Sequence, residues 1–207
     1  MIITFSGLDG SGKTTLIQHL EEYYLSNNIQ FDSYSIYGEL SFYAFFRILR
    51  SKFNKKNDID LKESKNEKKV IYKIFRNKNS KRFFLLFDIL LLYIIKFYYK
   101  LFGRILIIDR YFYDFIMEVT DEIGLYQKLL LHLFPEPNIS IFIETDPSVA
   151  FERKGEYDVS TLIYRREVYD KIFEHRPVTN FINNNNLSNA KIKLLNIINN
   201  YKINNGQ

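Results

Sequence analysis

The chain reads Gly7-Leu8-Asp9-Gly10-Ser11-Gly12-Lys13-Thr14 directly after an apolar run, Met1–Phe5. The spacing is G-x-x-x-x-G-K-T, with an expected strand before it and an expected helix from Lys13 after it. Glycines here let the backbone turn tightly and point N–H groups inward, and the helix start adds the positive end of its dipole. The stretch predicts a phosphate-binding loop; a chance glycine-rich turn is less favoured because strand and helix both flank it.

This loop predicts ATP and Mg²⁺ as cofactors. Lys13 is expected to reach the β- and γ-phosphate oxygens, and Thr14 to offer its hydroxyl to Mg²⁺. The residues expected to contact the nucleotide are Gly10, Ser11, Gly12, Lys13, Thr14 and Thr15.

Composition favours one α/β domain over residues 1–207. The chain is 46% hydrophobic, which is enough for a sizeable core. It has no cysteine, which excludes disulfides and thiolate metal sites. The start of the sequence has no basic region or cleavage site, so we expect no signal peptide and a cytoplasmic protein.

The net charge of +5 is unevenly distributed. Residues 50–82 contain thirteen Lys or Arg and four Asp or Glu, and residues 54–69 are expected to form a basic loop. Such a segment suits an anionic partner or a membrane surface, and a solvated loop is at least as plausible. Nucleic-acid binding is not expected because no recognition motif accompanies the charge.

Five β-rich runs alternate with helical patterns, which predicts a five-stranded, parallel, doubly wound sheet. The final helix is expected to be capped by Ser188, and another to begin with Asp146 as N-cap and Pro147 in its first turn. The expected strands are residues 2–6, 31–37, 105–108, 139–143 and 178–182.

Residues 83–102 form the most apolar stretch and approach the length of a membrane span. Asp88 lies inside this stretch, with Lys96 and Lys100 after it. A charged residue within a span costs about 2.5–3.5 kcal/mol on insertion scales. A buried helix packed on the sheet is therefore the favoured interpretation, and membrane contact is not expected.

Polar residues follow the expected strands at the edge where ligands bind in such sheets. Asp109 ends an apolar strand, the position at which Mg²⁺ is held beside a phosphate loop, and Arg110 offers a planar fork to phosphate oxygens. A capping Asp with a surface Arg is the simpler alternative. Glu39 and Glu144 fall at the same edge.

Four segments of the chain resemble the thymidylate kinase family of P-loop nucleoside monophosphate kinases. They occur in the family's order and cover most of the sequence. They are Gly7-Leu8-Asp9-Gly10-Ser11-Gly12-Lys13-Thr14-Thr15, Asp109-Arg110-Tyr111, Asp146-Pro147-Ser148-Val149-Ala150-Phe151-Glu152-Arg153 and Arg166-Glu167-Val168-Tyr169.

The resemblance implies a role for each matching residue and a homodimer packed through apolar helices. It implies that Lys13 and Thr14 serve ATP and Mg²⁺, that Asp109 organises the metal, and that Arg153 lies against the adenine or the phosphates. It also implies a lid around residues 153–168 that carries Arg165 or Arg166. The implied acceptor-binding residues are Asp9, Glu39, Arg110 and Tyr111.

The acceptor side departs from the family pattern. After the second strand only Glu39 has a counterpart, and Leu91 stands where the family has an arginine that grips the monophosphate. Losing a charge-assisted hydrogen bond of that kind costs roughly 1.5–3 kcal/mol. The nucleotide side thus follows the pattern, and the acceptor side does not.

Three functions are compatible with these observations. The favoured one is an ATP-dependent kinase of a nucleoside monophosphate, with thymidine monophosphate as one candidate. The second is a kinase of the same fold that phosphorylates a hydroxyl of a nucleoside, sugar or other small metabolite, with Glu39 or Asp9 as general base. The third is an ATP-binding module that docks on a membrane or a partner.

Overall fold

The computed structural model describes residues 1–35, 78–119 and 124–204. The expected basic loop at 54–69 and Glu39 lie outside the described residues.

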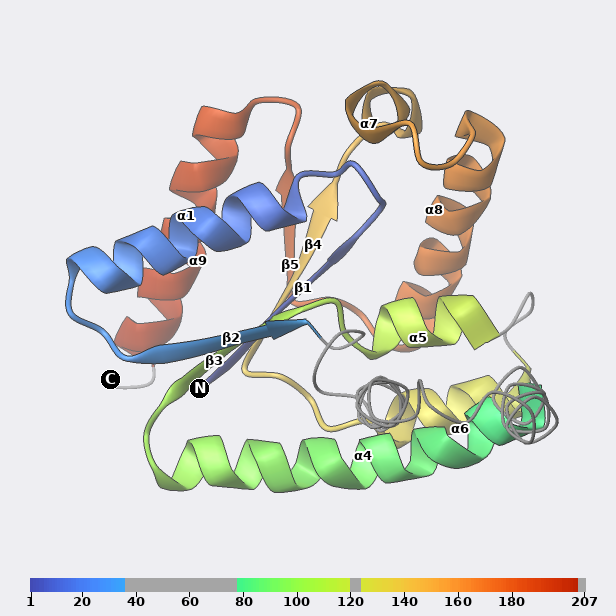
Figure 1. The fold of residues 1–207 in the computed structure, drawn as a ribbon, viewed down its shortest axis with the longest axis horizontal. Helices are drawn as coiled ribbons and strands as arrows, with labels where there is room; N and C mark the ends of the chain where they lie inside the picture. Colours follow the sequence, from blue (N-terminus) through green and yellow to red (C-terminus); the bar gives the residue numbers. More distant parts are fainter. Residues whose placement is uncertain (36–77, 120–123, 205–207) are drawn as a thin grey trace, which may run out of the picture.

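One parallel sheet organises the chain, with strand order β2-β3-β1-β4-β5 (Figure 1). Its register sets Phe5 of β1 between Asp109 of β3 and Ile141 of β4. This arrangement confirms the predicted five-stranded, doubly wound sheet. The strands are β1 (Ile2–Gly7), β2 (Phe31–Ser35), β3 (Ile105–Asp109), β4 (Ile139–Glu144) and β5 (Asn180–Asn183).

Helices cover both faces of the sheet (Figure 1). One face is covered by α1 (Lys13–Ser26) and α9 (Leu187–Asn204), and the other by α4 (Lys78–Leu101), α5 (Phe112–Val119), α6 (Leu125–Leu133) and α8 (Val159–His175). The short helix α7 (Pro147–Lys154) follows β4 at the carboxyl edge of the sheet. Because all strands are parallel, this edge collects the loop after β1 and the ends of β3 and β4.

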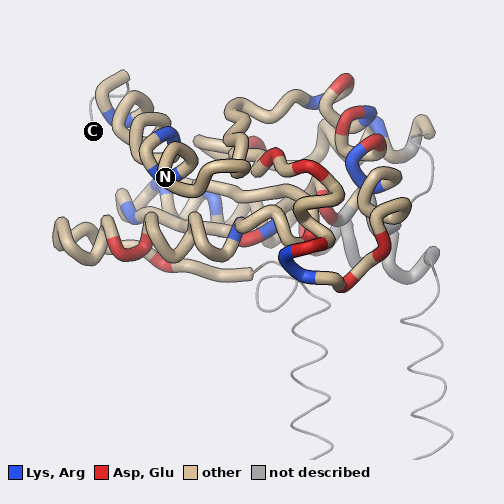
Figure 2. The backbone as a smooth tube through the Cα atoms, turned by 90° about the horizontal axis from the view of Figure 1, so that it is seen from above, with Lys and Arg blue, Asp and Glu red and all other residues tan. Residues whose placement is uncertain are grey.

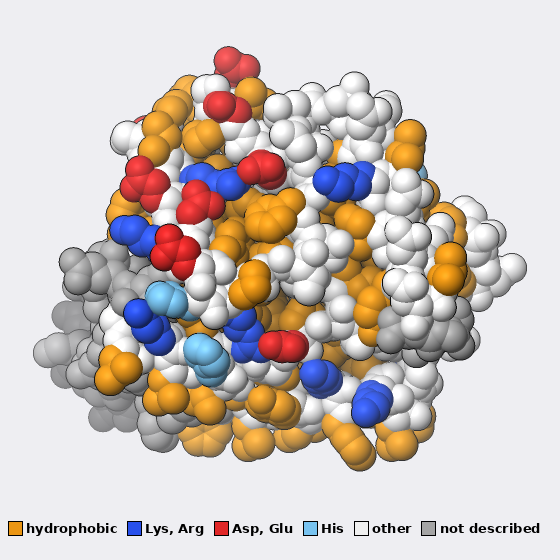
Figure 3. Space-filling view, turned by 180° about the vertical axis from the view of Figure 1, so that it is seen from behind, with side chains coloured by type: hydrophobic (Ala, Val, Ile, Leu, Met, Phe, Trp, Pro, Cys, Tyr) orange, Lys and Arg blue, Asp and Glu red, His pale blue; other side chains and the backbone are white. Residues whose placement is uncertain are grey.

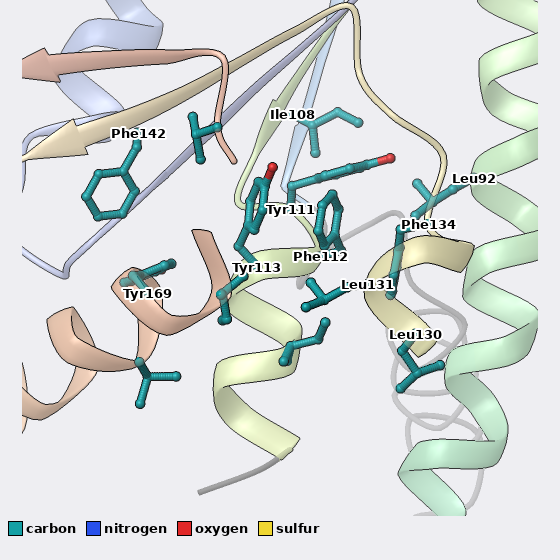
Figure 4. Close-up of a cluster of buried hydrophobic side chains, with 14 of the residues drawn as sticks. Leu92, Ile108, Tyr111, Phe112, Tyr113, Leu130, Leu131, Phe134, Phe142 and Tyr169 are labelled. Carbon is teal, nitrogen blue, oxygen red and sulfur yellow. The ribbon is translucent and has the colours of Figure 1, made fainter. Parts of the chain in front are cut away.

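The two layers of core follow from the alternation of side chains along each strand. On β1, Ile3 and Phe5 pack against α1 and α9, whereas Ile2 packs on the opposite face. That opposite face holds an aromatic cluster (Figure 4), in which the rings of Phe112 and Phe134 stack with centroids 5.0 Å apart. Burying side chains of this size stabilises the fold by about 1.5–3 kcal/mol each. This core holds α5 near the carboxyl edge of the sheet.

The apolar stretch is a helix, as predicted, but only one of its faces is buried. In α4 the side chains of Ile89, Leu92 and Tyr99 lie in the core, while Ile94 and Phe97 are exposed. Helical periodicity explains the correction, because a long helix on the outside of a layer can turn only about half of its surface inward. No helix among the described residues is long and apolar enough to cross a membrane.

Of the two predicted helix caps, one is confirmed and the other is wrong. Asp146 accepts a hydrogen bond from the backbone N–H of Ser148 at 2.8 Å, and Pro147 is the first residue of α7, as predicted. The predicted Ser188 cap of α9 is wrong. The helix begins at Leu187, one residue before Ser188, so Asn186 precedes it and its Oδ1 accepts from the N–H of Asn189 at 3.1 Å.

Candidate functional site

The glycine-rich loop joins the carboxyl end of β1 to the start of α1. Gly10 and Gly12 have φ angles of +84° and +88°, which only glycine adopts at little cost. A Cβ on Gly10 would lie 2.2 Å from the carbonyl oxygen of Ala150, so α7 packs directly on the loop. Gly10 therefore serves both the turn and the close contact with α7, whereas a Cβ on Gly12 would lie 2.2 Å from Nδ2 of Asn184.

Lys13, the first residue of α1, is almost fully buried in the loop. Its Nζ donates to the carbonyl oxygens of Gly7 and Leu8, each at 2.8 Å. Burial, together with the nearby charge of Arg110, lowers the pKa of Lys13 to about 8. An anionic ligand in the loop would favour the charged ammonium and restore its usual pKa.

Asp109 lies at the end of β3, next to the strand that carries the loop. Its Oδ1 is buried and has no hydrogen-bond partner among the described residues, and burial raises the pKa of this carboxyl. The side chains of Thr14 and Thr15 are exposed at the start of α1. The orphan carboxylate oxygen and the Thr14 hydroxyl are oxygen donors of the kind that Mg²⁺ prefers, so these residues fit the predicted metal.

The described residues contain no cluster of three or more His, Asp or Glu that would hold a metal by itself. Mg²⁺ commonly takes one or two protein ligands and completes its shell with water and substrate phosphates. Asp109 and Thr14 match that kind of site.

Three cations surround Asp9, the third residue of the loop, which is 7% exposed. Arg110 forms an ion pair with Oδ1, Arg165 of α8 donates to Oδ2 at 2.8 Å, and the Nζ of Lys154 lies 3.8 Å from Oδ1. Burial alone would raise the pKa of Asp9, but these cations and Lys13 bring it below its ordinary value. Asp9 is therefore held as a carboxylate and gathers positive charge beside the phosphate loop.

Arg110 is fixed by its backbone and by two carboxylates. Its φ of +67° is unusual for a residue with a side chain, and such strain is typical of functional positions. Its Nη1 donates to Asp114 at 3.1 Å, and its Nη2 pairs with Asp9. Asp114 is fully buried in α5 and also accepts from the Tyr169 hydroxyl at 2.7 Å. This second carboxylate sets the orientation of the guanidinium.

The two adjacent arginines of α8 point to different partners. Arg165 contacts Asp9, whereas Arg166 pairs with Glu144 at 3.0 Å and with Asp170 at 3.1 Å. Arg165 is therefore the arginine that lies beside Asp9 of the phosphate loop. The expected lid, residues 153–168, consists of the end of α7, a short connection and the first part of α8, with acidic and basic residues interleaved (Figure 2). The catalytic role given to Arg166 stays a prediction.

Arg153 lies beside the loop after β5. Its Nη2 donates to the carbonyl oxygen of Asn184 at 3.0 Å. Its predicted contact with the nucleotide stays a prediction.

Tyr111 is in the core, which corrects its predicted role as an acceptor-binding residue. It is 2% exposed, its hydroxyl donates to the carbonyl oxygen of Pro135 at 2.6 Å, and its ring packs edge-on against Phe112 (Figure 4). Its side chain belongs to the core cluster on the face of the sheet that α4, α5 and α6 cover. Burial raises the pKa of its hydroxyl.

The sequence did not single out two residues that support the site, Asp114 and Asn184. Asn184 is buried, and its Nδ2 donates to the carbonyl oxygen of Ser11 at 2.7 Å, where the hydroxyl of Thr145 also reaches at 3.3 Å. Asn184 lies in the asparagine run 183–186, and such a run by itself predicts only a loop. Asp114 carried a weak signal, an acidic residue in the first turn of a helix directly after the Asp109 strand end.

A phosphate loop after a central parallel strand, with an aspartate at the end of the neighbouring strand, defines the chain as a P-loop NTPase fold. The residues brought together are Asp9, Lys13, Asp109, Arg110 and Arg165, all at one edge of the sheet.

Comparisons with known proteins agree with this class. The NB-ARC domain family model matches residues 1–92, which include the phosphate loop. Among solved structures, thymidylate kinase from Ehrlichia chaffeensis is similar over 96% of this chain and 98% of its own, with a TM-score of 0.50 and 20% identity. No curated protein sequence matches the chain. The likeness confirms the fold of nucleoside monophosphate kinases that the motifs predicted.

Proposed function

We propose that the protein is an ATP- and Mg²⁺-dependent phosphotransferase that moves the γ-phosphate of ATP to a small acceptor, a nucleoside monophosphate first among the candidates. One observation carries the proposal: the Asp9 cluster with its three cations adjoins Lys13 and Asp109. Phosphoryl transfer needs little more than alignment and neutralisation of charge on the phosphates. A phosphate loop on one side and fixed arginines on the other supply both.

The proposal gives each group a role. Lys13 would exchange its two carbonyl partners for phosphate oxygens, and Asp109 with Thr14 would hold Mg²⁺, which neutralises the charge that develops on the phosphates. Arg165 and Arg110 would face the transferred group and the acceptor. Asp9 keeps both arginines at the loop before a ligand arrives.

A hydroxyl acceptor is the second candidate, and the pairing of Arg110 favours it. Arg110 already contacts the carboxylates of Asp9 and Asp114, so an acceptor phosphate would have to displace one of them. A hydroxyl acceptor needs a general base. The lowered pKa of Asp9 makes it a weak base, which favours Glu39 for that task.

A panel assay of ADP release tests the proposal. Nucleoside monophosphates, nucleosides and sugars are each incubated with the protein and ATP–Mg²⁺, with Lys13→Ala as the blank. We expect turnover on one class of acceptor, lost in Lys13→Ala. ATP binding without turnover on any acceptor would contradict the kinase and favour a non-catalytic ATP-binding module.

Glu39→Gln then separates the two acceptor classes. We expect a small effect if the acceptor is a phosphate and a loss of about 10²-fold or more in turnover if it is a hydroxyl. A modest loss on a confirmed hydroxyl acceptor would refute Glu39 as the base.

A further inference from the structure

Two polar side chains from different strand ends hydrogen-bond to one carbonyl oxygen of the phosphate loop, that of Ser11. The Nδ2 of Asn184, directly after β5, donates to it at 2.7 Å, and the hydroxyl of Thr145, directly after β4, donates to it at 3.3 Å. Both residues are 3% exposed. Because a carbonyl oxygen only accepts, the atom of Asn184 that faces Ser11 must be its amide nitrogen.

The backbone of Asn184 is held on both sides, which fixes the origin of its side chain. Its N–H donates to the carbonyl oxygen of Glu144 at 2.9 Å and continues the pairing of β4 with β5 by one residue. Its own carbonyl oxygen accepts from Arg153 at 3.0 Å. A Cβ on Gly12 would lie 2.2 Å from Nδ2, so the side chain packs directly on the loop backbone. Asn184 thus connects the edge of the sheet to the phosphate loop.

The carbonyl of Ser11 determines where the next N–H group points. The Ser11–Gly12 peptide is trans, and in a trans peptide the C=O and the N–H point in opposite directions. Since the oxygen faces Asn184 and Thr145, the N–H of Gly12 faces away from the ends of β4 and β5. This N–H has no hydrogen-bond acceptor among the described residues. It directly precedes Lys13, the expected phosphate contact.

We infer that Asn184 and Thr145 are positioning residues, which turn the N–H of Gly12 toward a bound phosphate. A donor that is already aligned needs no reorganisation when the anion binds, whereas a peptide group that is free to rotate does. Their role rests on the proposed function only in that a triphosphate occupies the phosphate loop. It does not depend on the acceptor.

Stability alone does not account for an asparagine at this position. The Oδ1 of Asn184 is buried and has no hydrogen-bond partner among the described residues. A buried oxygen without a partner is destabilising, so a small apolar residue would fill the same place at a lower cost. The amide is explained by its other half, the donor that is directed at Ser11.

Inorganic tripolyphosphate with Mg²⁺ provides the first test, because this probe has phosphates but no base or sugar. Exposed basic side chains, several of which lie beside acidic ones in Figure 3, can attract any polyanion, so Lys13→Ala serves as the blank. In isothermal titration calorimetry, Asn184→Ala should weaken binding about tenfold for both tripolyphosphate and ATP. Asn185→Ala, an exposed neighbour in the same run, should bind like the unaltered chain.

Thr145 provides a second, conservative pair of variants. Thr145→Val keeps the shape of the side chain and removes the hydroxyl, and it should weaken tripolyphosphate binding about threefold, because its hydrogen bond is the longer of the two. Thr145→Ser retains the hydroxyl and should bind like the unaltered chain. Circular dichroism at the assay temperature checks that each variant is folded.

The amide proton of Gly12 gives a direct signature in NMR. Serine labelled with ¹³C at the carbonyl and glycine labelled with ¹⁵N select the two Ser-Gly pairs of the chain, Ser6–Gly7 and Ser11–Gly12. The variant Ser6→Ala removes the first signal and so assigns the second. The Gly12 proton should move downfield when tripolyphosphate saturates the loop, because its N–H then donates to an anion. The movement should be smaller in Asn184→Ala.

Three results would overturn the inference. The first is equal tripolyphosphate binding by the unaltered chain and the folded Asn184→Ala variant, which would leave the nucleotide site itself intact. The second is weaker binding with an unchanged Gly12 signal at saturation, because the loss would then not act through this N–H. The third is no tripolyphosphate binding by the unaltered chain, which would also contradict the proposed function.

Discussion

Arg110 is constrained both in its backbone conformation and in the position of its guanidinium. A left-handed φ is costly for arginine, and it is retained here where the guanidinium meets Asp9 on one side and Asp114 on the other. Asp114 has no solvent to satisfy it and relies on Arg110, the N–H of Tyr111 and the hydroxyl of Tyr169. The cluster is therefore a structural element as well as a candidate site.

Asp114→Asn should lower the free energy of unfolding by about 1.5–3 kcal/mol, because a buried hydrogen bond to a charged group is lost. Tyr169→Phe should also cost about 1.5–3 kcal/mol, because its hydroxyl donates to the same charged carboxylate. Asp170→Asn breaks an exposed ion pair on α8 and should cost less than about 1 kcal/mol. Urea denaturation measures all three variants. Equal costs for Asp114→Asn and Asp170→Asn would contradict the role of Asp114 in holding Arg110.

The lowered pKa of Asp9 predicts how the free energy of unfolding depends on pH. Its pKa in the folded chain lies below the ordinary value, so the stabilising charge is complete above about pH 4 and is lost as the pH falls through the folded pKa. We compare unfolding free energies of the unaltered chain and Asp9→Asn from about pH 5 to about pH 2. The unaltered chain should have the higher free energy of unfolding near pH 5, and the difference from Asp9→Asn should shrink as the pH falls. A difference that stays constant would argue against the ion pairs.

Among the elements, the strands, the phosphate loop and the Asp109 strand end were all predicted from sequence. Their signals are local, since unbroken apolar runs and glycine spacing depend on residues close together in the chain. The outer face of α4 and the core position of Tyr111 were not predicted, because a hydrophobic residue has the same local pattern whether the protein or another surface covers it.

Gly10→Ala should abolish ATP binding and destabilise the chain by more than about 2 kcal/mol, since both φ and the Ala150 carbonyl oppose a Cβ. Gly103 provides the matched control. It also has a positive φ, of +63°, but a Cβ there would meet nothing within 4 Å. Gly103→Ala should therefore cost only about 1–2 kcal/mol of backbone strain and leave ATP binding intact. Calorimetry with ATP and urea denaturation measure both variants, and similar losses of ATP binding would contradict a role for the α7 contact.

The corrected cap of α9 makes a separate prediction. Asn186→Ala should lower the free energy of unfolding by about 1 kcal/mol, because the N–H of Asn189 loses its acceptor. Ser188→Ala lies inside the helix and should change it by less than about 0.5 kcal/mol. Thermal unfolding of the two variants distinguishes them, and the reverse order would restore Ser188 as the cap.

On the scale of the whole molecule, the site is assembled from segments that are distant in sequence. The carbonyl oxygen of Ser11 accepts hydrogen bonds from Thr145 and Asn184. Asp9 forms ion pairs with Arg110 and Arg165. The sheet order brings these segments to one edge. Sequence patterns predicted that edge but not these pairings, because the pairings depend on how far each helix rotates against its neighbours. The acceptor side is the least predictable part for the same reason.

This assembly predicts that ATP stabilises the entire fold. The loop is held by α7 and by the turn after β5, so a ligand that binds only the formed loop opposes unfolding of all of them. At about 100 times its dissociation constant, ATP–Mg²⁺ should add about 2.7 kcal/mol, or about 5–10 °C in the midpoint of unfolding for a chain of this size. Differential scanning calorimetry at rising ATP measures the shift. Adding EDTA should reduce it, because Asp109 and Thr14 then lose their metal, and Lys13→Ala should nearly remove it. If Lys13→Ala showed the full shift, ATP would bind elsewhere, and the assignment of the phosphate loop as the nucleotide site would be wrong.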